Sequence, residues 1–312
     1  MVIGLGLAEG IARLTYRKPW YERLVGEQNQ SAQTPRNRYG LRDRDFLLAK
    51  PRDERRVLIL GDSFTFGSGV ADESAIFPEL LERRLSDSTR MAGVSRIDVL
   101  NGGLRGSLTR DWLELWDKVS DAYRPDVLLV VFFLRDGTRT HSIPDFFGKV
   151  REEILLRNQR SLLYRHSYLF RIFQDHRDRK SVGDQYARAF MTAYFGDEAQ
   201  TAEWRLAQRN LLRLRDLARE KSVAVGLVIF PVLVELGPNY PFRRICEHVA
   251  DFARSAGIPV HDLLPDFLGR QAPDLWVSAF DQHPNAQAHR IAAESMYPFV
   301  RKLLESPQAR AR

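Results

Sequence analysis

The feature that most constrains the fold is the segment 57–70, which reads VLILGDSFTFGSGV. Its apolar start predicts a buried strand, and Gly61-Asp62-Ser63 ends that strand abruptly. A strand that runs directly into a glycine and a serine is how an α/β enzyme presents a nucleophile at the carboxyl edge of its sheet. The same residues also fit an ordinary turn with a helix cap, so a nucleophilic Ser63 requires a base and an orienting acid elsewhere.

Predicted strands and helices alternate along most of the chain. The strands are expected at 56–62, 97–101, 127–134, 223–230 and 259–263, and the helices at 72–85, 108–123, 201–221, 240–256 and 284–304. Pro284 would then occupy the first turn of the last helix. This alternation predicts a three-layer α/β/α sandwich around a flavodoxin-like parallel sheet of about five strands, in the order 2-1-3-4-5.

The chain divides into three parts by its pattern. Residues 1–54 form an N-terminal lead-in whose later part, rich in polar residues, is expected to be extended. Residues 55–305 form the main domain, and 306–312 form a tail. Within the main domain, the basic and aromatic section 138–200 breaks the alternation. We interpret it as a helical insertion over one end of the sheet, with a role either in packing or as a lid or substrate wall.

The amino terminus has two interpretations. Residues 1–8 are apolar, but a helix needs about 20 residues to cross a bilayer. The segment is either a short amphipathic helix or the end of a membrane anchor that begins further upstream. The second interpretation predicts membrane association through the N-terminus.

Composition excludes several classes of protein. The chain has 312 residues, a formal net charge of +7 and one cysteine, Cys246. A single cysteine excludes an internal disulfide and a cysteine-based zinc site. Although the chain is basic, no basic block is interleaved with stacking aromatic residues, so no nucleic-acid partner is expected. The composition does not predict the oligomeric state.

Polar and glycine-rich residues follow several of the predicted strands. They are Gly61-Asp62-Ser63, the run from Asn101 to Thr109, Arg135-Asp136-Gly137 and, after a loop, Asp281-Gln282-His283. Because parallel strands end at one edge of a sheet, these segments are expected to meet where a ligand would bind.

These segments resemble the SGNH hydrolases, also called GDSL-type esterases and lipases. The resemblance rests on Gly61-Asp62-Ser63, Gly106, Arg135-Asp136, Asp281 and His283. The lead-in residues 39–43 and 50–51 also look like the bacterial, envelope-associated branch of the family. That likeness implies a location in the cell envelope or periplasm rather than the cytoplasm.

The resemblance implies a role for each matching residue. Ser63 would be the nucleophile, His283 the general base and Asp281 the acid that orients it. The backbone N–H groups of Ser63 and Gly106 would form part of the oxyanion hole, with glycine at 106 because a side chain would keep the backbone from the oxyanion. The mechanism requires neither a cofactor nor a metal.

Two positions depart from the family pattern. Arg135 stands where the family has an asparagine that donates to the oxyanion, and it can donate there or hold a substrate carboxylate or hydroxyl. Asp281 and His283 are separated by one residue, whereas two is commoner. Asp136 and Asn101 are further candidates for oxyanion or substrate binding, although Asn101 is more typical of a residue that braces its loop.

The resemblance implies a serine esterase that removes a small acyl group, an acetyl group in particular, from a carbohydrate. Two alternatives remain open. An O-acyltransferase would pass the acyl group to a polysaccharide hydroxyl, and the aromatic insertion could supply the acceptor surface. A non-catalytic carbohydrate-binding member of the fold would explain why Arg135 replaces the asparagine.

Overall fold

The computed structural model describes residues 2–16, 36–87, 94–138, 143–278 and 281–310. Its centre is a five-stranded parallel sheet in the order β2-β1-β3-β4-β5. The strands are β1 (Glu54–Gly61), β2 (Arg96–Gly103), β3 (Val127–Phe133), β4 (Ala224–Phe230) and β5 (Val260–Asp262). The predicted fold class and strand order are therefore confirmed.

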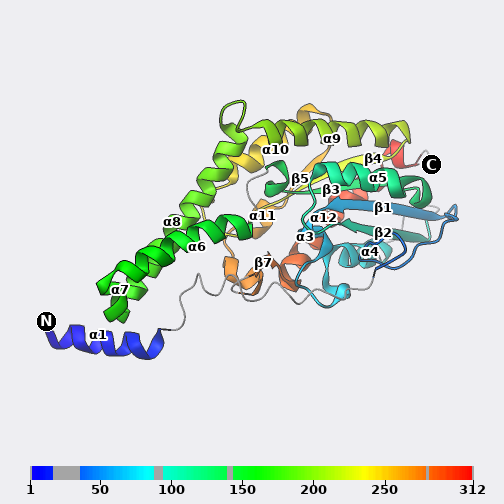
Figure 1. Ribbon diagram of the computed structural model, residues 1–312. Helices are drawn as coiled ribbons and strands as arrows, with labels where there is room; N and C mark the ends of the chain where they lie inside the picture. Colours follow the sequence, from blue (N-terminus) through cyan, green and yellow to red (C-terminus); the bar gives the residue numbers. More distant parts are fainter. Residues whose placement is uncertain (1, 17–35, 88–93, 139–142, 279–280, 311–312) are drawn as a thin grey trace.

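Helices cover both faces of this sheet (Figure 1). One layer contains α4 (Phe77–Asp87) and α12 (Ala286–Leu304), where Arg84 stacks on Tyr297. The other contains α5 (Thr109–Tyr123), α9 (Ala202–Glu220) and α10 (Arg243–Ser255), where Asn210 of α9 donates to Thr109 of α5 at 3.0 Å. The central strands are buried on both sides. In β3, for example, every residue is apolar and buried, as expected for a parallel strand between two helical layers.

The lead-in is part of the folded body from residue 36 onward. Leu41 and Phe46 are buried in the main core, and the buried guanidinium of Arg42 binds backbone carbonyl groups of the main domain. The sequence pattern predicted an extended segment here but did not predict that its side chains form part of the core. The part of the lead-in at 17–35 lies outside the described residues.

The first helix, α1, spans Val2–Thr15, so the segment 1–8 forms the start of a helix. Among the described helices, none combines the length and the apolar character needed to cross a bilayer.

Two local predictions are wrong, and one small element was not predicted. The expected helix at 72–85 is divided into a short turn, η1 (Glu73–Ala75), capped by Asp72, and α4. Pro284 does not begin the last helix, since it ends strand β7 (Asp281–Pro284), and Asn285 caps α12 by accepting from two backbone N–H groups. Strand β7 pairs with β6 (Trp276–Ser278) in a small antiparallel sheet that the sequence pattern did not predict.

The insertion forms a helical arm, which we define as α6 (Ile143–Arg160), α7 (Leu162–His166) and α8 (Tyr168–Phe195). Figure 1 shows the arm extending away from the sheet, with α1 lying across its far end. Among the arm residues whose side chains are described, only those in the last part of α8 join the main core, through Tyr186, Phe190 and Tyr194. The insertion is helical as expected, but most of the arm extends away from the sheet rather than lying over its end (Figure 1).

Candidate active site

Ser63 is the first residue of α3 (Ser63–Phe66), a single helical turn that begins directly after β1. Asp62 caps this turn, because its Oδ1 accepts the N–H of Phe64 at 2.8 Å. Glycine is required at 61, where a Cβ would lie 2.1 Å from Thr65 Oγ1. The close approach of the turn to the strand end leaves Ser63 half-buried at the carboxyl edge of the sheet.

A continuous chain of hydrogen bonds joins Ser63 to His283, 220 positions later in the sequence, and then to Asp281. Ser63 Oγ lies 3.0 Å from His283 Nε2, and His283 Nδ1 lies 2.5 Å from Asp281 Oδ1. The backbone N–H of His283 also donates to Asp281 Oδ1, at 3.1 Å. The structure thus brings together the three residues that the sequence analysis selected as nucleophile, base and acid.

The one-residue spacing between Asp281 and His283 follows from their position on a strand. Alternate residues of a strand point to the same side. In β7 this places the two side chains next to each other, so the short spacing suits an aspartate and a histidine that must interact. Burial raises the pKa of Asp281, but the hydrogen bonds and the charge of His283 outweigh it, so that this pKa is lowered overall. A carboxylate that stays ionised can hold the imidazole Nδ1–H.

Aromatic side chains pack against the ring of His283 and against one another. The Phe64 ring meets the His283 ring edge to face with centroids 5.6 Å apart, and it stacks on Phe133 at 4.1 Å. Phe230 packs against the same Phe64 ring at 5.1 Å. Since Phe64 follows Ser63 directly in α3, the same turn that presents the serine also packs the base.

The loop that carries Gly106 is tied to the nucleophile turn. Both the Leu104 N–H and the Ser107 hydroxyl donate to the carbonyl of Gly61, at 3.0 and 3.3 Å. Gly106 has a φ of 75°, which favours glycine, and a Cβ there would meet no atom within 4 Å. The glycine is thus explained by backbone conformation rather than by crowding. The N–H of Ser63, at the start of a helix, has no intrahelical acceptor.

Arg135 lies beside the nucleophile in an ion-paired cluster. It follows β3 in the short turn η2 (Leu134–Gly137), and its Nη2 is 3.2 Å from Asp62 Oδ2 and 3.7 Å from Asp136 Oδ1. Ser63 Oγ contacts the same Asp62 oxygen at 3.3 Å. Burial lowers the pKa of Arg135, but the charges of Asp62 and Asp136 raise it more. The guanidinium is therefore a charged neighbour of Ser63.

Asn101 and Asp136 lie beneath this edge rather than on it. Asn101 is completely buried, and its Oδ1 accepts the N–H of Gly103 at 3.0 Å, which is the bracing role. Asp136 Oδ2 accepts the N–H of Phe133 at 2.9 Å, and burial raises the pKa of its carboxyl well above the usual range. Neither side chain is exposed in this structure, and a role for Asp136 or Asn101 in oxyanion or substrate binding stays a prediction.

One supporting residue, Arg42, was not predicted from the sequence. Its Nη1 donates to the carbonyl groups of Phe66 and Gly67, at 3.2 and 2.6 Å, and its Nη2 donates to Val70 at 2.7 Å. These carbonyl groups end α3 and the loop after it, so a buried arginine from the lead-in holds the nucleophile turn in place. A buried charge satisfied by backbone carbonyls leaves no periodic signal in the sequence. Its place in the 39–43 segment was the only hint.

His289 is the other histidine near the site. It is completely buried in α12, where its Nδ1 accepts the N–H of Phe77 at 3.2 Å, and burial lowers its pKa to about 3. Within the described ranges, no group of three or more histidine, cysteine, aspartate or glutamate side chains is arranged to hold a metal ion.

A hydrogen-bonded serine, histidine and aspartate at the edge of a parallel sheet is the arrangement of a serine hydrolase. Residues 59–291 match the model of the GDSL-like lipase/acylhydrolase family. The chain belongs to this family and is accordingly an ester-bond hydrolase. No curated protein matches it significantly.

Several solved esterase structures are similar to this chain. The psychrotrophic esterase EstA from a Pseudoalteromonas species has a TM-score of 0.48 and 17% identity, covering 81% of this chain and 100% of its own. A catalytic mutant of the acetylxylan esterase Axe2 from Geobacillus stearothermophilus has a TM-score of 0.48 and 17% identity, covering 80% and 94%. A carbohydrate acetylesterase family member from Sinorhizobium meliloti has a TM-score of 0.45 and 14% identity, covering 81% and 100%.

The position of Arg135 gives a prediction about its role. Arg135→Ala is expected to lower kcat by about 10²–10³-fold, the usual cost of losing a donor beside the developing oxyanion. It should also lower Tm, because Asp62 and Asp136 would lose their cationic partner. Steady-state kinetics and thermal unfolding would measure both effects.

Arg135→Lys is the matched control, because it keeps the charge beside Asp62 without the planar fork of donors. Compared with Arg135→Ala, this variant should restore most of the lost Tm but little of the lost kcat. A main effect on KM would instead assign Arg135 to uniform substrate binding. Unchanged kcat and KM in Arg135→Ala would remove the residue from the site.

Proposed function

We propose that this protein is a serine esterase that removes a small acyl group, an acetyl group in particular, from a carbohydrate through a Ser63-His283-Asp281 triad. The observation that carries the proposal is the 3.0 Å contact between Ser63 Oγ and His283 Nε2, which continues through His283 Nδ1 to Asp281. A serine hydroxyl becomes an effective nucleophile only with such a base, and the base needs an orienting group.

In the first half of the reaction, Ser63 Oγ attacks the ester carbonyl carbon while His283 Nε2 takes the hydroxyl proton. Asp281 stabilises the imidazolium that forms. The negative carbonyl oxygen would face the N–H groups of Ser63 and Gly106, with the guanidinium of Arg135 close by. The tetrahedral intermediate then collapses, the carbon–oxygen bond to the sugar breaks, and His283 returns the proton to the departing sugar oxygen. The acyl group is left on Ser63.

In the second half, water replaces the sugar. His283 takes a proton from the water, the resulting hydroxide attacks the acyl carbon, and the bond to Ser63 Oγ breaks. His283 then returns the proton to Ser63, and the carboxylic acid leaves. Every proton that moves passes through His283 Nε2, so one correctly oriented ring serves both halves.

The exposure of the triad favours water as the acyl acceptor. The His283 side chain is 32% exposed and the Asp281 side chain 34%. An enzyme that transfers an acyl group to a sugar must keep water from the acyl-enzyme, because water would otherwise hydrolyse it. An open site is also accessible to an ester that projects from a bulky molecule, as an O-acetyl group projects from a carbohydrate.

The test uses an acetylated oligosaccharide, with and without an excess of the unacetylated oligosaccharide as acceptor. We expect free acetate in proportion to the acetyl groups lost, the same yield with the acceptor, and a fluorophosphonate adduct that peptide mass spectrometry maps to Ser63. Acetyl groups gained by the acceptor would instead establish an O-acyltransferase. Absence of both acetate and adduct, with retained binding of the oligosaccharide, would establish a non-catalytic carbohydrate-binding protein.

A further inference from the structure

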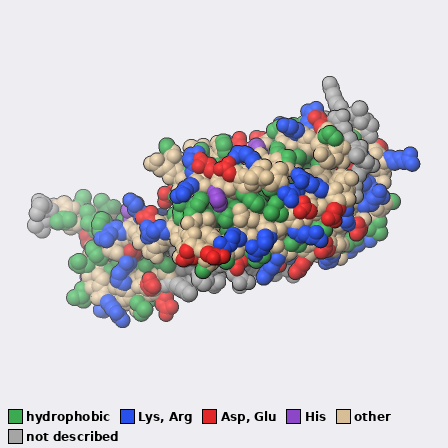
Figure 2. Space-filling model, turned by 90° about the horizontal axis from the view of Figure 1, so that it is seen from above, with side chains coloured by type: hydrophobic (Ala, Val, Ile, Leu, Met, Phe, Trp, Pro, Cys, Tyr) green, Lys and Arg blue, Asp and Glu red, His purple; other side chains and the backbone are tan. Residues whose placement is uncertain are grey.

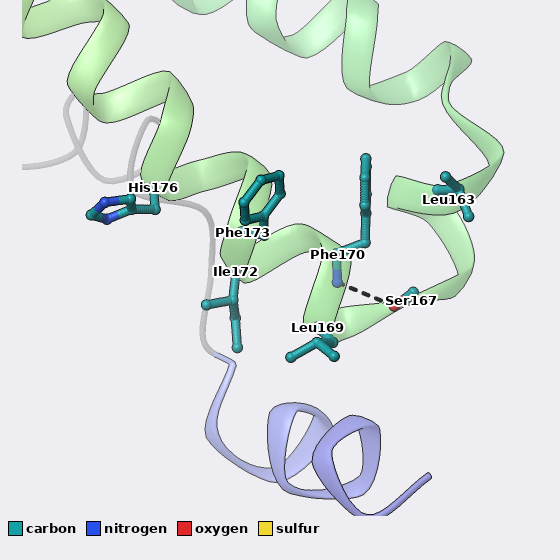
Figure 3. Close-up of a pocket in the computed structure, with 7 residues that line it drawn as sticks. All are labelled: Leu163, Ser167, Leu169, Phe170, Ile172, Phe173 and His176. Atoms are coloured by element: carbon teal, nitrogen blue, oxygen red, sulfur yellow. Dashed lines mark hydrogen bonds between the residues drawn. The ribbon is translucent and has the colours of Figure 1, made fainter. Parts of the chain in front are cut away.

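The far end of the helical arm exposes an apolar surface. Leu162, Leu163 and Phe173 are 69%, 62% and 55% exposed. An open groove of about 700 Å³ lies among Leu163, Phe170 and Phe173 and their neighbours, and its lining is almost wholly apolar (Figure 3). Soluble proteins rarely expose contiguous apolar patches of this kind without an interaction partner. The groove lies far from Ser63, so the proposed reaction does not account for it.

Helix α1 adds a second apolar surface at the same place. Leu7, Ile11 and Leu14 are 69%, 55% and 89% exposed. They stand at positions i, i+4 and i+7, so they form one stripe along the helix. The stripe is not used to attach α1 to the arm, and it is therefore available to another surface.

Polar contacts, together with the edge-to-face packing of Tyr16 on Tyr168, attach this part of the chain to the arm. The Glu9 carboxylate accepts the N–H groups of Tyr168 and Leu169, at 2.8 and 3.0 Å, and so caps the start of α8. These backbone bonds are the main reason that the pKa of Glu9 is lowered to about 2. Directly after the end of α1, Tyr16 donates to Asp175 at 2.9 Å. Helix α1 is thus held in a defined position at the projecting end of the arm (Figure 1), the end that also carries the exposed Leu162 and Leu163.

The charge around these apolar side chains is positive. Residues 157–180 contain seven arginine or lysine residues and two aspartates. Both aspartates have partners, since Asp175 accepts from Tyr16 and Tyr164 and the buried Asp178 pairs with Arg157. The exposed charges of this segment are therefore basic. Figure 2 shows hydrophobic and basic side chains together at the projecting end.

We propose that this projecting end, formed by α1, α7 and the first part of α8, is a docking surface for an anionic lipid bilayer. Exposed leucine and phenylalanine side chains would enter the boundary between headgroups and acyl chains, and the surrounding arginine and lysine residues would lie among the anionic headgroups. Attachment of this kind is peripheral and requires no membrane-spanning helix.

Flotation of the full chain with vesicles tests the proposal. The protein should float with vesicles of phosphatidylcholine and phosphatidylglycerol, and much less with phosphatidylcholine alone. Leu162→Ser with Leu163→Ser should lower the partition coefficient by about 10–100-fold. Arg165→Gln with Lys180→Gln should lower it by about fivefold for each charge removed, and only for the anionic vesicles.

Two matched control pairs come from the main body. Leu47 and Leu48 are 62% and 54% exposed but lie away from the arm, so Leu47→Ser with Leu48→Ser should leave vesicle binding unchanged. Arg213→Gln with Arg290→Gln removes two exposed charges from the body in the same way. All four double variants should hydrolyse a soluble ester at the wild-type rate, so that loss of docking is separated from failure of the proposed function.

Three results would overturn the proposal. The first is a wild-type protein that does not float with anionic vesicles, and the second is an equal loss of binding in the arm and body variants. The third is dimerisation, measured by light scattering, that the Leu162→Ser and Leu163→Ser changes abolish while vesicle binding is absent. That result would make the surface an interface between copies of this chain.

Discussion

Ser63→Ala is expected to abolish the hydrolysis of para-nitrophenyl acetate, with kcat lowered on the order of 10⁶-fold. The methyl group cannot attack the carbonyl carbon, and His283 would be left without the hydroxyl that lies 3.0 Å from its Nε2. The fold should remain intact, because the cap of α3 comes from Asp62 and not from the serine. Initial rates and circular dichroism of both proteins would measure these effects.

Ser74→Ala is a suitable control for this change. Ser74 is exposed in the turn η1, and its loss should leave kcat and KM at wild-type values. The fluorophosphonate adduct should likewise persist in Ser74→Ala and disappear in Ser63→Ala. Equal hydrolysis by the wild type and by Ser63→Ala would show that another group performs the reaction.

Asp281→Asn should have the second-largest effect, a loss of about 10⁴-fold in kcat. An asparagine can present an N–H to His283 Nδ1, which would move the ring proton to Nε2. The Nε2 atom would then face Ser63 as a donor and could not accept the hydroxyl proton. The change preserves the shape of the side chain, so the loss would come from the wrong tautomer rather than from a displaced ring.

The control for this variant is Asp274→Asn, since Asp274 is exposed in the turn η3 (Ala272–Leu275) that precedes β6. Its activity should match that of the wild type. Stability offers a second readout, because the pKa of Asp281 is lowered in the folded protein. A lowered pKa stabilises the fold above the usual carboxyl range, and this contribution is lost as the pH falls through the folded-state pKa. The Tm difference between the wild type and Asp281→Asn should therefore narrow in acid. An undiminished kcat in Asp281→Asn would remove Asp281 from the mechanism.

The sheet could be predicted from the sequence because its central strands are continuous apolar runs. Val57–Leu60 and Val127–Phe133 are buried on both faces, and such runs are typical of parallel strands between two helical layers. The hairpin of β6 and β7 could not be predicted in this way. Its strands are short, and the sequence DQHP shows no alternation of apolar and polar residues.

The candidate site could be predicted only in part, for a similar reason. Ser63, Asp281 and His283 stand in recognisable motifs, whereas the partner of Arg135 is decided by packing. Asp62 and Arg135 are separated by 73 positions, and only the pairing of β1 with β3 brings their side chains together. The direction of the arm could not be predicted from the sequence either. Hydrophobic periodicity predicts that a segment is helical, but it does not predict how the helix is oriented relative to the sheet.

Helix α8 also determines how far apart two parts of the molecule stand. Its first residue, Tyr168, is held by Glu9 at the end of the arm, and Tyr186 lies close enough to Arg135 to affect the pKa of that arginine. The two residues are 18 positions apart, which corresponds to about 27 Å of helix. A helix of this kind acts as a spacer rather than as a flexible tether. When the end of the arm is docked on a bilayer, Ser63 would reach only those esters that lie at a fixed distance from the membrane surface.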